Sequence, residues 1–453
     1  MQNILLLAAS YFFYALWDYR FLSLIIISSL TDFVIGLKLH QEKRTSIRKV
    51  LLIGSLTVNL GFLLVFKYCN FFVDSFSDLI SLFGFQANYT TLNIVLPVGI
   101  SFYTFQTLSY TIDIYRNKLE PSKSTLNFFT YVAFFPQLVA GPIERASNLL
   151  PQIEKRRTFS YDEAKDGMRQ ILWGLFKKVA IADNCALLVD PIFNNYQDYN
   201  GSILILGAIL FAFQIYGDFS GYSDIAIGTA KLFGVKLMQN FATPYFSRDI
   251  AEFWRRWHIS LSTWFRDYLY IPLGGSRVSQ LLQLRNIFAI FLVSGFWHGA
   301  NWTFILWGGI HAVCYIPQVF SKTNRRFLDW VAKNKMIPSL YELYRVFLTF
   351  FIVTFAWIFF RAPSIEDAFK YIGSIFKFNN SSDGYFQLDI SLLNYIIPFI
   401  LIMLVLEWFN RAYEYGIKQL PSNIFVRYSI YIFLSLIVLQ YLYGESEFIY
   451  FQF

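Results

Sequence analysis

Long apolar runs separated by short polar stretches dominate the pattern of this chain. A hydrocarbon core about 30 Å thick requires roughly 20 apolar residues in a helix, and runs near this length recur along the sequence. Several runs are too short to cross upright, so we expect re-entrant or broken helices, which persist at membrane depth only inside protein or around a cavity. The predicted spans are Asn3–Trp17, Phe21–Leu37, Val50–Tyr68, Asn93–Ile112, Leu126–Val139, Gly167–Leu188, Ser202–Tyr216, Asn286–Trp297, Trp302–Phe320, Tyr344–Phe360, Tyr395–Phe409 and Val426–Tyr443.

This pattern predicts an all-α polytopic membrane protein. We expect about 10 to 12 transmembrane helices, with re-entrant and interfacial helices around a buried cavity. The composition agrees, because hydrophobic residues make up 56% of the chain and charged residues only 15%. A soluble protein of this length needs more polar surface than that.

The basic residues cluster in loops beside apolar runs. The net charge is +8, and the stretches "KLHQEKRTSIRK" at 38–49 and "SKTNRR" at 321–326 hold much of the surplus. The positive-inside rule places both loops in the cytoplasm, where they suit lipid headgroups or a phosphorylated donor. We find no nucleic-acid motif, and we expect membrane lipid rather than nucleic acid around the chain.

Histidine is scarce in this sequence, yet two of the four histidines lie in one apolar stretch, "SGFWHGANWTFILWGGIHA". His298 precedes Gly299-Ala300-Asn301, which predicts a break between helices at the mouth of a cavity. Its imidazole, with an ordinary pKa of about 6.5, suits proton transfer near neutral pH. His311 should not share a helical face with His298, and it is expected to be a hydrogen-bonded core residue whose role stays open.

A third histidine lies in "AEFWRRWHISLSTWFRDYLYIPLGG", which the pattern predicts as an amphipathic helix ended by Pro272 and two glycines. One face of that helix would carry Trp254, His258, Leu261 and Phe265. Glu252 and Arg256, four residues apart, would form a favourable pair. The helix carries too many charges to cross lipid exposed, so it either lies at the interface or lines a polar cavity.

Polar groups also follow the apolar span Ser202–Tyr216, in "GDFSGYSDIAIG". Gly217 and Gly221 predict a sharp bend or a close helix approach. Asp218 either lines a functional cavity or caps the next helix, and Asp224 is expected to have a structural partner. The three cysteines show no CxxC spacing, so neither a disulfide framework nor a thiolate metal site is predicted.

Several stretches together resemble the membrane-bound O-acyltransferase family, most closely its bacterial branch of alginate O-acetylase-like proteins. They are "LPVGISFYTFQTLSYTIDIYR", "FFPQLVAGPIERA", "GLFKKVAIAD", "GDFSGYSDIAIG", "FWRRWHISLSTWFRDYLYIPLGG" and "GFWHGANWTFILWGGIHA". The resemblance predicts a single domain over 1–453, best matched at about 92–320, with C-terminal helices at about 340–453. Family members carry a further hydrophobic segment before "NILLLAASYFFYALW", so the resemblance predicts a truncated N-terminus.

The resemblance implies transfer of an acyl group from a thioester donor, acyl-CoA and in this branch acetyl-CoA, to a hydroxyl. It assigns the principal catalytic role to His298 and the second active-site position to His258. We expect His298 to act as general base, and His258 to orient the acceptor or stabilise the oxyanion. The residues expected to bind substrate are Asp218, Tyr222, Arg256, Trp264, Arg266, Trp297 and Asn301.

The resemblance further implies a multi-pass protein of the bacterial cytoplasmic (inner) membrane, which passes the acyl group to an extracytoplasmic acceptor protein or polysaccharide. Three alternatives stay open. In the first, the transferred group is D-alanyl or a longer acyl chain. In the second, the chain is a transporter or flippase, although no internal repeat supports this. In the third and weakest, His258, His298 and His311 bind a metal. The chain lacks the HExxH pattern, so no metal site is predicted.

Overall fold

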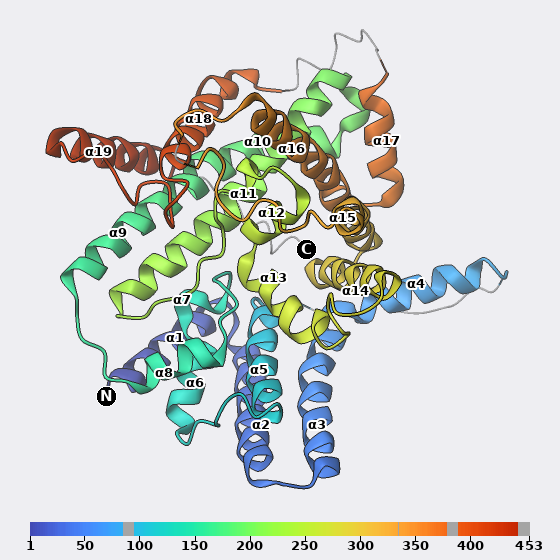
Figure 1. Cartoon of the computed structure of the whole chain (residues 1–453), viewed down its shortest axis with the longest axis vertical. Helices are drawn as coiled ribbons and strands as arrows, with labels where there is room; N and C mark the ends of the chain where they lie inside the picture. The colour runs from blue at the N-terminus through green and yellow to red at the C-terminus, as the bar shows by residue number, and fades with distance from the viewer. Residues whose placement is uncertain (85–94, 334, 378–387, 443–453) are drawn as a thin grey trace. The chain divides into compact units, whose positions relative to one another are not determined.

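The computed structural model describes residues 1–84, 95–333, 335–377 and 388–442, and their regular secondary structure is helical throughout (Figure 1). This confirms the all-α prediction. The chain divides into two compact units. The first unit comprises Met1–Glu163 with Ala230–Met238, and the second comprises Ala164–Thr229 with Gln239–Phe453. The expectation of one domain over 1–453 stays a prediction.

The first unit packs around a buried polar centre. The carboxylate of Asp32 accepts hydrogen bonds from Asn59 at 2.8 Å, from Thr111 at 3.0 Å and from Ser55. These donors satisfy a buried carboxylate that would otherwise be costly. The helices of this unit are α1 (Gln2–Asp18), α2 (Leu22–Gln41), α3 (Thr45–Leu63), α4 (Cys69–Ser81), α5 (Ile100–Tyr115), α6 (Thr125–Ala133), α7 (Phe135–Leu138) and α8 (Ala146–Glu154).

The second unit holds His258, His298 and His311. A π-helical segment, Phe176–Ala182, joins its first two helices, and another, Arg266–Tyr270, follows α13. Its helices are α9 (Tyr161–Leu175, which begins in the first unit), α10 (Asp183–Asn194), α11 (Gly201–Leu232), α12 (Ile250–Arg256), α13 (Ile259–Phe265), α14 (Gln280–His298), α15 (Trp302–Phe320), α16 (Leu340–Arg361), α17 (Ile365–Ile375), α18 (Leu393–Phe409) and α19 (Ile424–Tyr441).

Helices α14 and α15 form a tight hairpin, and glycine makes its closeness possible. A Cβ on Gly295 would lie 2.2 Å from the carbonyl oxygen of Phe304, and a Cβ on Gly308 would lie 2.2 Å from that of Phe291. Both distances are far below van der Waals contact, so only glycine allows the two backbones to approach this closely. The hairpin turns directly after His298, which fixes that residue at the helix end.

The predicted bend at Gly217 and Gly221 is wrong, and the predicted close approach is confirmed. Helix α11 runs unbroken through both glycines for 32 residues. A Cβ on Gly221 would lie 2.8 Å from the carbonyl oxygen of Gly174 in α9. An unbroken α-helix satisfies its own backbone hydrogen bonds at membrane depth, which favours a continuous helix over a bend. The glycines instead allow close packing against a neighbouring helix.

Among the described residues, eight helical segments are long and apolar enough to cross a membrane, and the chain is a multi-pass membrane protein. They are Gln2–Gln41, Thr45–Ser81, Gly201–Leu232, Gln280–His298, Trp302–Phe320, Leu340–Arg361, Ile390–Phe409 and Ile424–Tyr441.

Eight is fewer than the predicted number of crossings, for identifiable reasons. The predicted spans Asn3–Trp17 and Phe21–Leu37 fall within one 40-residue segment. The predicted span Leu126–Val139 forms two short helices, the second of which has a proline in its first turn.

The predicted span Asn93–Ile112 begins outside the described residues, at 93–94, and its helix runs only from Ile100 to Tyr115. The predicted span Gly167–Leu188 carries four charged residues and is not among the eight. The predicted span Val426–Tyr443 is among them as Ile424–Tyr441, and only its residue 443 lies outside the described residues.

Candidate active site

His258 lies at a break between two short helices, where a continuous helix was expected. Helix α12 ends at Arg256, and His258 adopts a left-handed backbone, with φ 45° and ψ 54°, directly before α13. The segment 239–242 bridges the break. The Ala242 N–H donates to the carbonyl of Arg256 at 2.9 Å, and the Ile259 N–H donates to that of Asn240 at 2.9 Å. These bonds replace helical ones, so the predicted common face from Trp254 to Phe265 does not form.

The imidazole of His258 is completely buried within a small polar network. Its Nδ1 lies 3.1 Å from Oδ1 of Asn240, which also accepts from Ser260 Oγ at 2.8 Å. Asn240 Nδ2 donates to Ser223 Oγ of α11 at 3.0 Å. The network links three separate segments to one ring, so it holds the imidazole in a fixed orientation.

His298 is the last residue of α14 and is 3% exposed. The chain turns extended at Gly299, and Asn301 then caps α15 by accepting from the Thr303 N–H at 3.0 Å. The predicted helix break at 299–301 is therefore confirmed. The ring centroids of His298 and His258 are 6.3 Å apart, so the structure brings the two predicted catalytic histidines together.

Aromatic side chains enclose this pair. Phe219 packs on His258 with ring centroids 4.6 Å apart, and Trp307 packs edge-on against His298 at 5.2 Å. Trp297, a predicted site residue, contacts His298 at 5.0 Å and His258 at 5.9 Å. The low polarity of this surround lowers the pKa of His258 to about 3, because burial disfavours the charged imidazolium.

His311 lies on α15 and is completely buried. Its Nδ1 accepts a hydrogen bond from the indole N–H of Trp254 at 3.3 Å, and its ring packs on Trp307 at 5.0 Å. This confirms a hydrogen-bonded core residue. Trp307 also contacts His298, so two histidines on different helices share one aromatic neighbour. Across the described residues, no three His, Cys, Asp or Glu side chains are grouped as metal ligands.

The acidic residues of α11 have lysine partners from the π-helical segment at 176–182. Lys178 pairs with Asp218 at 2.7 Å, and its ammonium lies 5.5 Å from the ring centroid of Tyr222. Lys177 pairs with Asp224 at 2.6 Å, as expected for a structural role. Pairing of this kind is what allows charges to remain buried at membrane depth.

The remaining predicted residues lie along and after the broken helix. Arg256 pairs with Glu252 at 2.9 Å, which confirms the predicted pair. Trp264 is buried against Tyr268, with ring centroids 4.9 Å apart. The side chain of Arg266 is 58% exposed and pairs with the neighbouring Asp267 at 2.8 Å. The binding of substrate by these residues stays a prediction.

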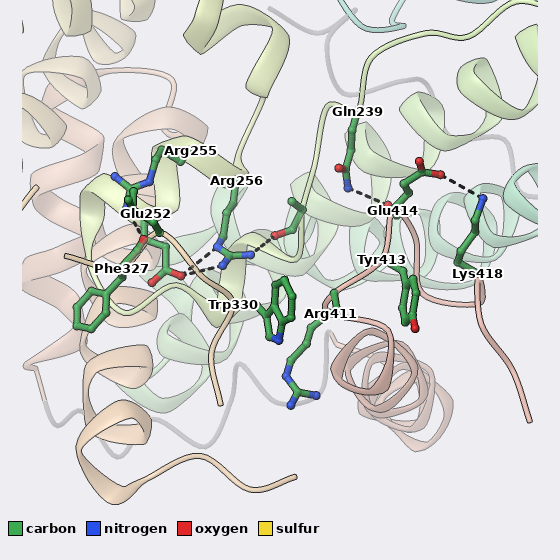
Figure 2. A pocket seen from close by; sticks show the side chains of 13 residues that line it. Gln239, Glu252, Arg255, Arg256, Phe327, Trp330, Arg411, Tyr413, Glu414 and Lys418 are labelled. Atoms are coloured by element: carbon green, nitrogen blue, oxygen red, sulfur yellow. Dashed lines mark hydrogen bonds and ion pairs between the residues drawn. The ribbon is translucent and has the colours of Figure 1, made fainter. Parts of the chain in front are cut away.

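A pocket of about 550 Å³ adjoins the broken helix (Figure 2). Two of its walls, α12 and the segment 239–242, are the elements that hold His258. Its lining carries four cationic and two acidic side chains, three aromatic rings, a leucine, two alanines and a glutamine. The lining residues are Gln239, Ala242, Glu252, Arg255, Arg256, Phe327, Leu328, Trp330, Arg411, Ala412, Tyr413, Glu414 and Lys418.

Sequence reasoning named one residue that lines the pocket, Arg256, as a substrate-binding residue, and missed the rest of the pocket and Asn240. The residues that line the pocket come from 239–256, 327–330 and 411–418, which no sequence periodicity links. Asn240 lies in a short irregular segment without a motif of its own. One further sequence feature pointed to this pocket: the basic stretch at 321–326, which directly precedes the lining residue Phe327.

Comparisons with known proteins identify the family of this chain. Residues 121–360 match the model of the membrane-bound O-acyltransferase family. The chain is 40% identical over 383 residues to the "Probable alginate O-acetylase AlgI" of Pseudomonas aeruginosa, covering 83% of this chain and 70% of that protein. It is 36% identical over 404 residues to the "Peptidoglycan O-acetyltransferase" of Helicobacter pylori, covering 83% and 74%.

A more distant relative is the "Teichoic acid D-alanyltransferase" of Bacillus subtilis, 27% identical over 290 residues, which cover 60% of this chain and 70% of that protein. The family match includes the broken helix, the α14–α15 hairpin and both facing histidines. The chain belongs to the membrane-bound O-acyltransferase family, and it is an O-acyltransferase.

Proposed function

We propose that this chain is an O-acetyltransferase of the bacterial cytoplasmic membrane, which moves an acetyl group from a cytosolic thioester to an extracytoplasmic polysaccharide or to a partner protein. The observation that carries the proposal is the burial of His258 and His298 side by side in an aromatic surround, with ring centroids 6.3 Å apart. The names of the two more similar relatives, an alginate and a peptidoglycan O-acetyltransferase, favour acetyl transfer to a polymer.

His298 acts as the general base in this proposal. The acceptor hydroxyl gives its proton to the imidazole of His298 while its oxygen bonds to the thioester carbonyl carbon. The oxyanion that forms then collapses, the carbon–sulfur bond breaks, and the departing thiolate takes the proton back from the imidazolium. His258 assists beside it, and the aromatic surround excludes water that would otherwise hydrolyse the thioester.

The pocket beside α12 supports a donor that carries phosphate and a planar ring, as acetyl-CoA does. Within the residues that the structure describes, Arg255 and Arg411 donate to backbone carbonyl oxygens and form no salt bridge, so neither guanidinium is held by a carboxylate in direct contact. Trp330 also lines the pocket and offers an aromatic ring next to them. The pocket adjoins the basic stretch 321–326, which the positive-inside rule places in the cytoplasm, where such a donor is found.

A kinetic experiment tests the donor assignment. Arg255→Gln keeps a donor for the carbonyls of Asn324 and Phe327 but removes the charge. We expect the KM for acetyl-CoA to rise about 10- to 100-fold, the value of a charged hydrogen bond, with kcat little changed. Lys370→Gln, which removes an exposed charge on α17, is the control and leaves both constants unchanged. An unaltered KM in Arg255→Gln contradicts the assignment.

A second candidate for the transferred group is D-alanyl, which the more distant relative supports. The mechanism would be the same, because a D-alanyl thioester presents the same carbonyl carbon to the acceptor hydroxyl. Purified protein in liposomes supplied with either radiolabelled acetyl-CoA or a D-alanyl thioester distinguishes the two. We expect transfer of the acyl group from acetyl-CoA and no transfer from the D-alanyl thioester. Transfer from the D-alanyl donor alone would replace the acetyl proposal.

A further inference from the structure

The hydrogen bonds around Asn240 have a direction that the backbone fixes. The Ser260 N–H can only donate, and it lies 3.3 Å from Asn240 Oδ1, so that atom is the amide oxygen. The amide nitrogen then faces Ser223 Oγ, which can accept. His258 Nδ1 is 3.1 Å from the oxygen, which has no proton to give, so the proton of this hydrogen bond belongs to the ring.

We propose that Asn240 holds His258 as the Nδ1–H tautomer, so that its Nε2 presents a lone pair, and not an N–H, to the reacting groups. Nε2 is buried and has no hydrogen-bond partner among the residues described. The ring centroid of His298 lies 6.3 Å from that of His258. The inference rests on the proposed function only in assigning these groups to acyl transfer.

Asn240 restrains His258 through its main chain as well as its side chain. Its carbonyl accepts from the Ile259 N–H at 2.9 Å, which holds the left-handed turn at His258 in place. Phe219 and Phe241 pack on the imidazole with centroids 4.6 Å and 6.3 Å away. The ring therefore cannot rotate freely to exchange its two nitrogens, and Asn240 is a positioning residue for it.

The fixed tautomer decides between the two roles expected of His258. A lone pair cannot donate a hydrogen bond to an oxyanion, whereas it can accept one from a polar hydrogen of the acceptor. His258 is also a weak base, because burial lowers its pKa to about 3. His258 therefore orients the acceptor, and the transferred proton goes to His298.

Nitrogen NMR on histidine-labelled protein in detergent reads the tautomer directly. The chain has four histidines, and the signals that disappear in His258→Asn identify those of His258. We expect an Nδ1–H ring in the unchanged protein and in Asn240→Asp, whose carboxylate still accepts from the ring. In Asn240→Leu, which has no acceptor, the Nδ1–H signature is lost. An Nε2–H ring in the unchanged protein overturns the proposal.

Activity supplies the second readout. Asn240→Leu should lower kcat about 10- to 100-fold, the usual effect of losing a partner that orients a histidine, and Asn240→Asp should restore most of it. Asn184→Leu is the control, since within the described part of the chain the side-chain hydrogen bonds of this buried asparagine go to the carbonyls of Val179 and Ala180. Full kcat in Asn240→Leu overturns the proposal. If NMR shows the Nδ1–H ring but the unchanged protein transfers no acyl group, the proposed function is contradicted and the tautomer proposal stands.

Discussion

At the scale of single residues, the surroundings of each buried histidine determine what it can do. His311 is tied to Trp254 within the aromatic core, whereas His258 and His298 face each other near a helix break. Hydrogen bonds are stronger in such a weakly polar setting, and a thioester survives longer where water is excluded. The site gains both advantages from the same aromatic rings.

Substitution of His258 separates hydrogen bonding from proton transfer. His258→Asn keeps an amide that can donate toward Asn240 and accept from the acceptor, so we expect reduced but measurable acetyl transfer. His258→Leu provides neither group and should show no transfer. Rates are measured with protein in liposomes, after size-exclusion chromatography confirms that both variants are folded. Equal and complete loss in the two variants would show that proton transfer through the imidazole is required at this position.

The buried, neutral His258 also makes stability depend on pH. Its pKa is lowered from about 6.5 to about 3 on folding, so below pH 6.5 the unfolded chain binds a proton that the folded chain does not. Stability is therefore lost as the pH falls from 6.5 toward 3. Between pH 6.5 and pH 5 the unchanged protein should lose about 2 kcal/mol more than His258→Asn, at 1.36 kcal/mol per pH unit. Denaturant unfolding at both pH values measures the difference, and equal losses contradict it.

At the scale of elements, the site depends on two interruptions of helical structure. The first is the break between α12 and α13, which the segment 239–242 bridges. The second is the turn between α14 and α15, two helices whose close packing depends on glycine. The first interruption places His258 and the second ends α14 at His298. Backbone geometry therefore holds each of the two histidines at the end of a helix.

Adjacent glycines of α15 test this dependence. A Cβ on Gly308 would lie 2.2 Å from the Phe291 carbonyl, so Gly308→Ala should push the helices apart, destabilise the protein by about 1 to 3 kcal/mol and reduce acyl transfer. A Cβ on Gly309 would lie 3.7 Å from a Leu292 side chain, an ordinary contact, so Gly309→Ala should leave activity unchanged. Thermal unfolding and transfer assays compare the pair, and similar behaviour of the two variants contradicts the argument.

Periodicity predicted the elements whose structure is local and failed where tertiary contacts decide. The apolar runs, the break after His298 and the Glu252–Arg256 pair were predictable because each depends on neighbouring residues. The break at His258 was not, since it depends on hydrogen bonds from the segment 239–242. The pocket was not either, because its walls are more than 150 residues apart in the sequence, from Gln239 to Lys418.

At the scale of the whole molecule, the proposed reaction has a direction across the membrane. The stretch 321–326 is expected in the cytoplasm with the donor, while a polysaccharide acceptor lies on the opposite side. The histidines must therefore be reached by donor and acceptor from different faces. A multi-pass protein that hands an acyl group outward also needs a docking surface for the protein that receives it.

This direction predicts a relay. The chain alone, in detergent with acetyl-CoA and free polysaccharide, should acetylate the polysaccharide poorly, because no extracytoplasmic protein is present to carry the group. Addition of an extracytoplasmic partner protein that accepts the acetyl group should restore transfer. The measurement is acetate released by alkali from the recovered polysaccharide. Efficient acetylation by the chain alone would refute the relay and leave the acyltransferase assignment intact.

The most direct test of the account is acyl transfer by His298→Ala. The purified variant, in liposomes with radiolabelled acetyl-CoA and acceptor, is compared with the unchanged protein at equal amounts of inserted, folded chain. Loss of general-base assistance should lower turnover about 10²- to 10⁴-fold while the KM for acetyl-CoA changes little. Turnover equal to that of the unchanged protein would contradict the assignment of His298 as the base.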